Sequence, residues 1–323
     1  NLAWNARITI DLFGFKKGDI GLTVLPLFHI FGQNCIMNAS IFAGITNILL
    51  KRFEPDNVIR LIYKKKVSIF AGVPTMFWGL LNELKSFDKE KISLLKRHWR
   101  IALSGGAAMP VELLNDFEKI YEIPIFEGYG MSEASPLVTY NSPGHKRKIG
   151  SVGLPLWGVN VRVVDDQLIE VPNYEVGQII FRGHNVMKGY FNNKEATKKA
   201  IKKGWMHSGD LGYKDNEGYF FIVDRLNDVI IRGGTNIYPR EIEEEIIKHP
   251  KISLVAVVGI PDERLGEEIK AYLVLKKEQK LSKTEFKLWI TKKLAANKYP
   301  REIEIIKELP MNATGKIIKR KLR

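Results

Sequence analysis

Residues 100–110 have the sequence Arg-Ile-Ala-Leu-Ser-Gly-Gly-Ala-Ala-Met-Pro, in which an apolar strand pattern passes into a glycine pair and then, beyond Pro110, into a helical pattern. In open α/β sheets, ligands bind beyond the carboxyl ends of the strands. The Gly105–Gly106 pair occupies that position here. The stretch therefore predicts an α/β fold with a binding edge at this point, although a glycine pair alone does not identify a ligand.

The same alternation of strand and helix patterns extends from Asn1 to about Tyr140. Strands that alternate with helices form a mostly parallel sheet with both faces covered. We therefore predict an α/β domain with a mostly parallel sheet core. The expected strands are residues 21–25, 47–50, 68–72 and 100–104.

The pattern changes twice further along the chain. From Gly150 to Val223 the apolar segments are short and separated by glycines, which predicts a small barrel-like β subdomain. Beyond Asp228 the sequence predicts a compact C-terminal α+β unit. Its expected elements are helices at 239–248 and 283–295 and strands at 253–258 and 269–276.

The composition limits the class of protein. A chain of 323 residues with 45% hydrophobic and 27% charged residues is globular and long enough for about two domains. The single cysteine, Cys35, cannot form an intramolecular disulfide, which suits a reducing compartment. The first residues do not have the pattern of a secretion signal. We therefore expect a cytoplasmic location.

The net charge of +14 admits two interpretations. Many lysines stand near glutamates at helical spacing, as in residues 192–199, which is typical of a solvated, lysine-rich surface. The alternative is attraction of anionic partners such as ATP, CoA and an anionic membrane surface. We do not expect nucleic acid as a partner, because no zinc-finger spacing or RNA-binding aromatic motif accompanies the charge. The sequence does not indicate an oligomeric state.

Residues 20–50 contain no Asp, Glu, Lys or Arg, which is also typical of a membrane-spanning segment. Polar residues interrupt the apolar run repeatedly, among them Gln33, Asn34 and Asn47. We therefore interpret the segment as a buried strand, helix and strand of the α/β core.

Four motifs occur in a fixed order along the chain. They are Gly128–Glu133 (Gly-Tyr-Gly-Met-Ser-Glu), Trp205–Gly212 (Trp-Met-His-Ser-Gly-Asp-Leu-Gly), the run from Asp224-Arg225 to Gly233–Pro239, and Pro310–Ile317 (Pro-Met-Asn-Ala-Thr-Gly-Lys-Ile). Together they resemble the adenylate-forming superfamily, which includes acyl-CoA synthetases, firefly luciferase and the adenylation domains of peptide synthetases. The family also carries an upstream Ser/Thr/Gly-rich phosphate loop that ends in Lys, and no such stretch is present here. The resemblance thus implies a chain that lacks the N-terminal third of the family's length and is inactive, or nearly so, on its own.

The resemblance implies a reaction in two halves, with ATP, Mg²⁺ and CoA as cofactors. A carboxylate attacks the α-phosphorus of ATP to give an acyl-adenylate and pyrophosphate, and a thiol then displaces AMP. Both transition states accumulate negative charge on oxygen, so they need cationic and hydrogen-bonding groups. Lys316 is the implied catalytic cation, Ser132 contacts phosphate and Glu133 holds Mg²⁺, a hard cation that prefers oxygen ligands.

The resemblance also implies the binding residues. Asp210 and Arg225 correspond to the pair that holds the ribose hydroxyls, and Gly233 and Gly234 to the wall of the CoA thiol tunnel. His29 lies where the family places a histidine beside the acyl group, although a lone His on an apolar segment is often only a core residue. The cofactor-binding set is Gly105, Gly106, Ala107, Gly128, Tyr129, Gly130, Met131, Asp210, Arg225, Gly233 and Gly234.

The resemblance sets the domain boundary as well. It implies a large AMP-binding domain over residues 1–226, divided into 1–149 and the β subdomain 150–226, and a mobile C-terminal domain over 227–323. Asn227 is the implied hinge between them, in place of the Asp or Lys that is commoner in the family.

The function expected is that of a fatty acid–CoA ligase for medium- or long-chain acids. One alternative is an adenylation enzyme for another acid, such as an amino or aryl acid. The other is a non-catalytic, basic homologue that binds membranes or nucleic acid. The presence of Lys316, Glu133 and Asp210 argues against the non-catalytic alternative.

Overall fold

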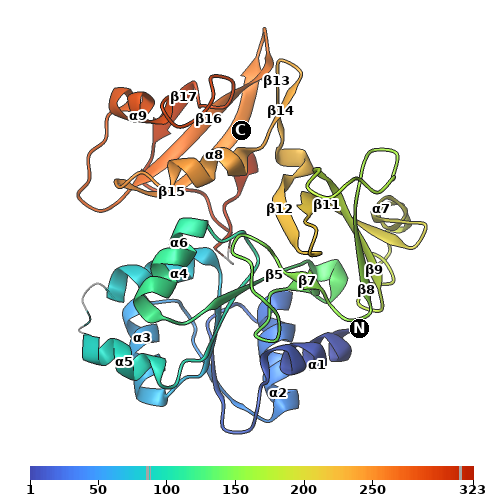
Figure 1. Cartoon of the computed structure of the whole chain (residues 1–323), viewed down its shortest axis with the longest axis vertical. Coiled ribbons are helices and arrows are strands. Elements are labelled where there is room, and N and C mark those ends of the chain that lie inside the picture. Colours follow the sequence, from blue (N-terminus) through green and yellow to red (C-terminus); the bar gives the residue numbers. More distant parts are fainter. Residues whose placement is uncertain (85–86, 88, 313–314) are drawn as a thin grey trace. The chain divides into compact units, whose positions relative to one another are not determined.

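The computed structural model describes residues 1–84, 87, 89–312 and 315–323. The described chain divides into two compact units (Figure 1). Unit 1 comprises Asn1–Ser208 and Tyr213–Ile222, and unit 2 comprises Gly209–Gly212 and Val223–Arg323. Each unit is described by itself below. The domain boundary that we predicted at Asn227 stays a prediction.

Unit 1 is built on a seven-stranded sheet with the order β2-β1-β3-β4-β5-β6-β7. The strands from β2 to β5 are parallel, whereas β6 and β7 are antiparallel to their neighbours. The predicted mostly parallel α/β core is therefore confirmed. The strands are β1 (Ile20–Thr23), β2 (Thr46–Leu49), β3 (Ile69–Gly72), β4 (Ile101–Ser104), β5 (Ile125–Gly130), β6 (Leu137–Tyr140) and β7 (Leu154–Pro155).

Helices cover both faces of this sheet, because alternate residues of each central strand point to opposite sides. Ile101 and Leu103 of β4 belong to one apolar cluster, which includes residues of α1, η1 and α2. Ala102 belongs to the other, with residues of α3 to α6. The helices are α1 (Leu2–Phe13), the π-helix η1 (Phe31–Asn38), α2 (Ala39–Ala43), α3 (Pro55–Lys65), α4 (Pro74–Leu84), α5 (Lys89–Lys96) and α6 (Val111–Tyr121).

The uncharged segment 20–50 forms β1, η1, α2 and β2, as predicted for a strand, helix and strand of the core. Several of its polar side chains have structural partners. The amide of Asn34 is fully buried and donates hydrogen bonds to the backbone carbonyls of Ser135 (2.8 Å) and Leu2 (3.1 Å). None of the helices within the described residues combines the length and apolar character that crossing a bilayer requires.

The β subdomain is a five-stranded sheet. Four of its strands have the order β10-β11-β9-β8, and the fifth, β12, also pairs with β11. The boundary between the units runs through it, because the middle of β11 and the end of β12 belong to unit 2. Its elements are β8 (Val159–Val164), β9 (Gly177–Gly183), α7 (Lys194–Ala200), β10 (Ile201–Lys202), β11 (Trp205–Lys214) and β12 (Phe220–Arg225).

The rest of unit 2 is an α+β fold around a long antiparallel hairpin, β15 and β16. Residues of α8, α9 and β17 complete one apolar core with it, including Ile242, Phe286 and Ile303. The elements are η3 (Leu226–Asp228), β13 (Ile230–Arg232), β14 (Thr235–Ile237), α8 (Pro239–Ile246), β15 (Ile252–Asp262), β16 (Gly266–Leu275), α9 (Lys283–Ile290), β17 (Glu302–Ile305) and η4 (Lys319–Lys321). Both predicted helices are shorter than expected, and both predicted strands are longer.

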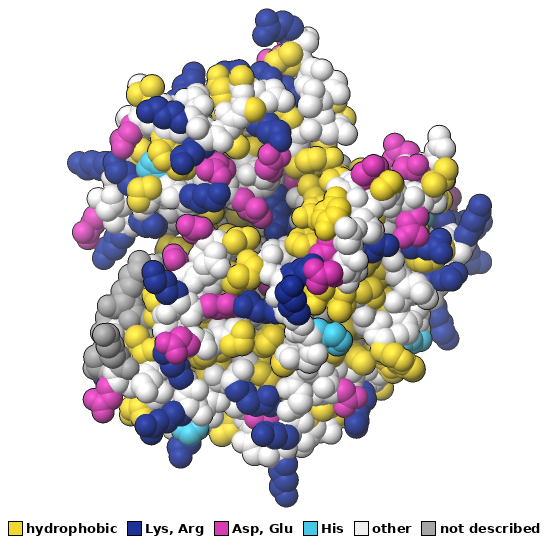
Figure 2. Space-filling view, in the orientation of Figure 1, with side chains coloured by type: hydrophobic (Ala, Val, Ile, Leu, Met, Phe, Trp, Pro, Cys, Tyr) yellow, Lys and Arg dark blue, Asp and Glu magenta, His cyan; other side chains and the backbone are white. Residues whose placement is uncertain are grey.

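Charged side chains are distributed over the surface. On the face shown in Figure 2, Lys and Arg side chains are scattered among carboxylates and apolar side chains rather than gathered in one patch. Several lysines form ion pairs, such as Lys148 with Asp215 and Glu217. This arrangement supports the interpretation of the positive charge as a solvated, lysine-rich surface.

Candidate active site

Two of the predicted binding motifs meet at the carboxyl edge of the parallel sheet in unit 1. Ser104, the last residue of β4, stands opposite Glu127 of β5, so the segments that follow these residues emerge side by side. A Cβ placed on Gly105 would lie 3.8 Å from the carbonyl oxygen of Gly128. The structure therefore brings together the stretches that contain Gly105–Ala107 and Gly128–Met131.

A third segment reaches the same edge. The aromatic ring of Phe31 lies 3.4 Å from the position of a Cβ on Gly105. His29, two residues earlier, is half-buried, and its Nδ1 accepts a hydrogen bond from the backbone N–H of Phe31 at 3.3 Å. The structure thus places the turn that carries His29 beside the Gly105 loop, although His29 also has local partners of its own.

The glycines of the Gly128–Met131 segment have a structural reason that does not depend on a ligand. A Cβ on Gly128 would lie 2.2 Å from the ring of Tyr140, and one on Gly130 would lie 2.1 Å from the carbonyl oxygen of Pro136. Close packing within the protein itself therefore requires glycine here, whether or not a nucleotide approaches. The spacing of the motif alone could not distinguish these two causes.

Glu133 is held by a segment that the sequence did not link to it. It lies in the short 3₁₀ turn η2 (Ser132–Ala134), where Ser132 is exposed and Glu133 is half-buried. The hydroxyl of Tyr190 donates a hydrogen bond to Oε1 of Glu133 at 2.8 Å, and the backbone N–H of Met187 donates to its carbonyl oxygen at 2.8 Å. Burial and the neighbouring Glu133 raise the pKa of Tyr190, so its hydroxyl remains a donor.

The fit of Glu133 to Mg²⁺ can be tested on its surroundings. Within the described residues, no three His, Cys, Asp or Glu side chains gather as a protein-only metal site would require. A single carboxylate nevertheless suits Mg²⁺, which usually takes its remaining ligands from water and substrate phosphates. Glu133 therefore fits a cation that arrives with a nucleotide.

Three of the predicted residues lie together in unit 2. The Arg225 Nε lies 3.6 Å from Oδ1 of Asp210, which is only 14% exposed. Burial lowers the pKa of Lys316, the charge of Arg225 lowers it further, and the carboxylates of Asp210 and Asp228 oppose both effects. Lys316, Arg225 and Asp210 thus share one electrostatic environment, although 91 residues separate Arg225 from Lys316 in the sequence.

The loop that carries Lys316 is closed by local hydrogen bonds. Met311 pairs with Ile317, and the backbone N–H of Lys316 donates to Oδ1 of Asn312 at 2.9 Å. Residues 313 and 314 of the predicted Pro310–Ile317 motif lie outside the described residues. In the described part of the motif, the backbone of Lys316 is therefore held by hydrogen bonds to its neighbours.

The predicted hinge residue Asn227 is exposed and lies in the 3₁₀ turn η3. A guanidinium nitrogen of Arg323 donates to the carbonyl oxygen of Asn227 at 3.0 Å and to Oδ1 of Asp228 at 2.9 Å. Sequence reasoning missed this contact, because 96 residues separate the two partners. The role of Asn227 as a hinge stays a prediction.

Two structural interactions support this part of unit 2. Asp224 is buried, and its Oδ2 accepts a hydrogen bond from the backbone N–H of Arg240 at 2.9 Å, in the first turn of α8. The ammonium of Lys319 lies 2.8 Å from Oε1 of Glu243, also on α8. Both residues therefore anchor segments that flank the predicted site.

Gly233 and Gly234 form the two-residue turn between β13 and β14, with φ of +57° and +78°. Positive φ at both central residues is typical of a type I′ hairpin turn, which favours glycine. Nothing lies within 4 Å of a Cβ on Gly234. Backbone conformation therefore accounts for this pair within unit 2, and a role in a CoA tunnel stays a prediction.

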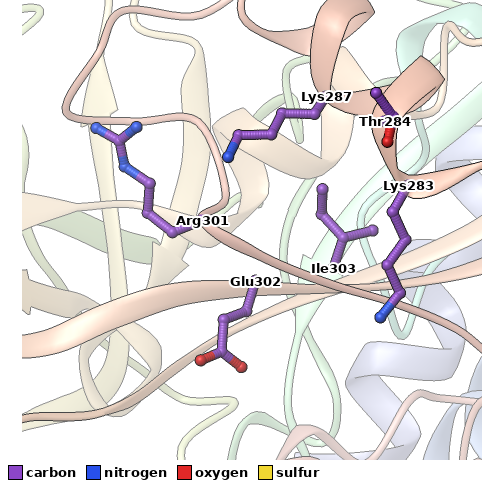
Figure 3. A pocket seen from close by; sticks show the side chains of 6 residues that line it. All are labelled: Lys283, Thr284, Lys287, Arg301, Glu302 and Ile303. Atoms are coloured by element: carbon purple, nitrogen blue, oxygen red, sulfur yellow. The ribbon is translucent and has the colours of Figure 1, made fainter.

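Two hollows in the described residues lie elsewhere. One, of about 280 Å³, lies at the carboxyl ends of β1 and β2 and is lined by residues 23–28 and 49–51. The other, of about 430 Å³, lies in unit 2 beside α9 (Figure 3). None of the predicted site residues lines either hollow.

Comparison with known proteins gives consistent matches. The family model "AMP-binding enzyme" matches residues 1–191, and "AMP-binding enzyme C-terminal domain" matches residues 241–316. A long-chain-fatty-acid–CoA ligase of Bacillus subtilis is 42% identical over 96% of this chain and 55% of its own length. A feruloyl-CoA synthase of Amycolatopsis is 36% identical over 100% of this chain and 65% of its own length.

Solved structures give the same picture. ATP-bound MatB from Rhodopseudomonas palustris has a TM-score of 0.92 at 32% identity, covering 100% of this chain and 63% of that chain. The o-succinylbenzoate CoA synthetase of B. subtilis, in complex with its acyl-adenylate intermediate, has a TM-score of 0.87 at 33% identity, covering 100% and 64%. The chain thus spans between about half and two thirds of the length of the relatives it matches.

Proposed function

Because this chain belongs to the AMP-binding enzyme family, we propose that it acts in an AMP-forming acid–CoA ligase. The carboxylic acid and ATP would give an acyl-adenylate and pyrophosphate, and the thiol of CoA would then displace AMP to give the thioester. The observation that carries this proposal is the grouping of Lys316, Arg225 and Asp210 in unit 2. A cation beside a ribose-binding pair is what an adenylate-forming site needs.

In this proposal, unit 1 supplies the surface for the nucleotide. The Gly105–Ala107 loop and the Gly128–Met131 segment contact the adenine and the acyl group from the edge of the sheet, and Ser132 contacts phosphate. Glu133 would hold Mg²⁺, which, when bound, would neutralise phosphate charge. Tyr190 fixes one oxygen of Glu133 by its hydrogen bond.

Unit 2 supplies the charged groups. Asp210 accepts hydrogen bonds from the ribose hydroxyls, as a carboxylate can from two donors. Lys316 stabilises the negative charge that develops between the substrate carboxylate and the α-phosphate. Gly233 and Gly234 would line the path of the CoA thiol in the second half-reaction. Asn227 would be the hinge about which the C-terminal domain moves between the two half-reactions.

We propose a medium- or long-chain fatty acid as the substrate, in a cytoplasmic reaction. The support is the 42% identity to the B. subtilis ligase named for long-chain fatty acids. An aryl acid is the second candidate, because relatives named for ferulate and 2-succinylbenzoate are each 36% identical to this chain. None of the relatives reported above is named for an amino acid substrate or for a non-catalytic role.

The test uses a fusion in which the segment of the B. subtilis ligase that precedes its matched region is joined to the N-terminus of this chain. We call this fusion the extended protein. Palmitate, ferulate and 2-succinylbenzoate are compared for pyrophosphate release and for thioester formation, with Lys316→Ala as the control. The proposal requires acid-dependent pyrophosphate release that Lys316→Ala abolishes. Release without dependence on any acid, or equal release by the control, would contradict it, and preference for ferulate would favour the aryl-acid candidate.

A further inference from the structure

The hollow of about 430 Å³ in unit 2 has an unusual charge distribution. Its lining comes from two elements, the helix α9 and the chain at the start of β17 (Figure 3). It is open to solvent, because Ile303 at its base is buried whereas the other lining residues are exposed. The lining residues are Lys283, Thr284, Lys287, Arg301, Glu302 and Ile303.

Three cations and one carboxylate line this hollow. Lys283 and Lys287 are one helical turn apart on α9, so their side chains leave the same face of the helix. Within the described residues, neither lysine forms an ion pair. Glu302 is the single acid in the lining, so the hollow keeps a net positive charge.

Three carboxylates on neighbouring elements are already paired with other bases. Glu285 pairs with Lys251 at 2.7 Å. The two oxygens of Glu268 accept hydrogen bonds from Arg232 at 2.7 and 2.8 Å, and Glu304 pairs with Lys270 at 2.9 Å. None of the three carboxylates forms an ion pair with Lys283, Lys287 or Arg301, although the charge of Arg301 contributes to the lowered pKa of Glu268.

Arg301 is oriented before any ligand arrives. One guanidinium nitrogen donates to the carbonyl oxygen of Ala296 at 2.9 Å, and the guanidinium stacks on the ring of Tyr299 at 4.0 Å. These contacts restrict the side chain but use only part of its five N–H donors. A pre-oriented guanidinium is well suited to bind phosphate oxygens.

We propose that this hollow binds the phosphate group of an organic phosphate. Phosphate oxygens match the two ammonium groups and the guanidinium, and the hydroxyl of Thr284 adds a further donor. The hollow is larger than one inorganic phosphate, so it has room for an organic body beside the phosphate. The source is a soluble phosphate ester or a lipid headgroup, which share this chemistry. The proposal does not depend on the proposed function, since none of the predicted site residues lines the hollow.

The first experiment uses the 323-residue chain and inorganic phosphate as the probe, followed by calorimetry or by NMR, with chloride at equal ionic strength as the reference. The test variant carries Lys283→Ala, Lys287→Ala and Arg301→Ala. The matched control carries Lys277→Ala, Lys280→Ala and Lys307→Ala, which remove the same charge from exposed positions of unit 2 that do not line the hollow. Thermal melts of both variants verify that they are folded.

The proposal predicts saturable phosphate binding that the test variant weakens by about tenfold or more, as expected when charge-assisted hydrogen bonds are lost. The control should change the affinity by no more than about twofold, since exposed charges are largely screened. Equal weakening in both variants would mean that net charge alone causes the loss of phosphate affinity, which would overturn the proposal. Lack of saturable binding by the unaltered chain would overturn it too.

A second pair of probes identifies the source. Adenosine 3′,5′-bisphosphate represents a soluble ester, and phosphatidylcholine vesicles with and without phosphatidic acid represent a lipid headgroup. Binding of the bisphosphate that the test variant loses and the control retains assigns a soluble ligand. The same dependence with phosphatidic acid vesicles alone assigns a lipid. If neither probe depends on the three residues, the proposal of an organic phosphate is wrong.

Discussion

The hydroxyl of Tyr190 donates a hydrogen bond to Oε1 of Glu133 at 2.8 Å, and Tyr190 is itself fixed from the other side. The hydroxyl of Thr197, on α7, accepts the backbone N–H of Tyr190 at 2.9 Å. The hydroxyl of Thr197 in turn donates a hydrogen bond to the backbone carbonyl oxygen of Asn193 at 2.8 Å. The orientation of Glu133 therefore depends on a helix more than 50 residues away in the sequence.

We predict that Tyr190→Phe weakens the response of the extended protein to Mg²⁺. The hydrogen bond to a carboxylate contributes about 1–2 kcal/mol, so the apparent Mg²⁺ affinity should fall by roughly tenfold while the phenyl ring preserves packing. The measurements are a Mg²⁺ titration of pyrophosphate release and direct binding of Mn²⁺ with ATP. Tyr174→Phe is the control, because that tyrosine is exposed and contacts the ring of Tyr213 instead. An unchanged Mg²⁺ dependence in Tyr190→Phe would remove Tyr190 from the site.

We predict that Asp210→Asn weakens AMP binding more than it weakens the fold. The ion pair between Asp210 and Arg225 contributes little stability, because Arg225 is 57% exposed and its charge is screened by water. A carboxylate accepts two ribose hydroxyls better than an amide does, so the AMP affinity of the extended protein should fall by about tenfold. Calorimetry with AMP measures the affinity, and a thermal melt measures stability.

The control for that prediction is Glu170→Gln. Glu170 lies 3.6 Å from the guanidinium of Arg162 and 3.0 Å from the ammonium of Lys214, outside the predicted site. Equal effects of the two substitutions on AMP binding would show that Asp210 has no specific role.

The pairing of Lys319 with Glu243 leads to a prediction about stability. Burial alone would lower the pKa of Lys319, but Glu243 and Asp224 outweigh it and raise the pKa above 10.5. A base whose pKa is higher in the folded state contributes stability below its unfolded pKa and loses it as the pH rises through the folded value. We therefore expect Lys319→Met to lower the free energy of unfolding by about 2 kcal/mol at neutral pH, less than for a fully buried pair.

The pH dependence distinguishes this ion pair from a simple packing effect. The difference in stability between Lys319→Met and the unaltered chain should shrink as the pH rises above 10.5, measured by urea denaturation. Lys321→Met, at an exposed position two residues along, should have little effect at any pH. A difference that stays constant with pH would mean that Lys319 stabilises by packing alone.

The sequence predicted the fold largely from local patterns. The apolar runs that became β1, β3 and β4 were located to within one or two residues, because buried parallel strands are apolar on both faces. The helix predicted at 283–295 ends at Ile290 instead, although Leu294 still packs against the core. The apolar spacing continued beyond the helix, so it could not indicate where the backbone changed direction.

The site was less accessible to sequence reasoning. Contacts such as Tyr190 to Glu133 and Arg323 to Asn227 join residues that are 57 and 96 positions apart. No local pattern encodes such pairs. The glycines were identified as special, but the motif could not show that Tyr140 and Pro136 are the groups packed against Gly128 and Gly130. Tertiary packing decides which physical cause applies to each glycine.

The last prediction separates two reasons for glycine at position 234. Its φ of +78° disfavours most side chains, whereas the space around its Cβ is open within unit 2. Asn tolerates positive φ far better than Ala or Leu does. Gly234→Asn should therefore keep the melting temperature close to that of the unaltered chain, whereas Gly234→Leu should lower it.

If Gly234 also lines the path of CoA, Gly234→Asn in the extended protein should release pyrophosphate normally in a single turnover but form little acyl-CoA. Gly14→Asn is the matched control, since Gly14 has φ of +56° and an equally open Cβ position at the end of α1. It should leave both half-reactions unchanged. Normal thioester formation by a stable Gly234→Asn variant would mean that the hairpin turn alone explains the glycine, because the added side chain would then meet nothing in either half-reaction.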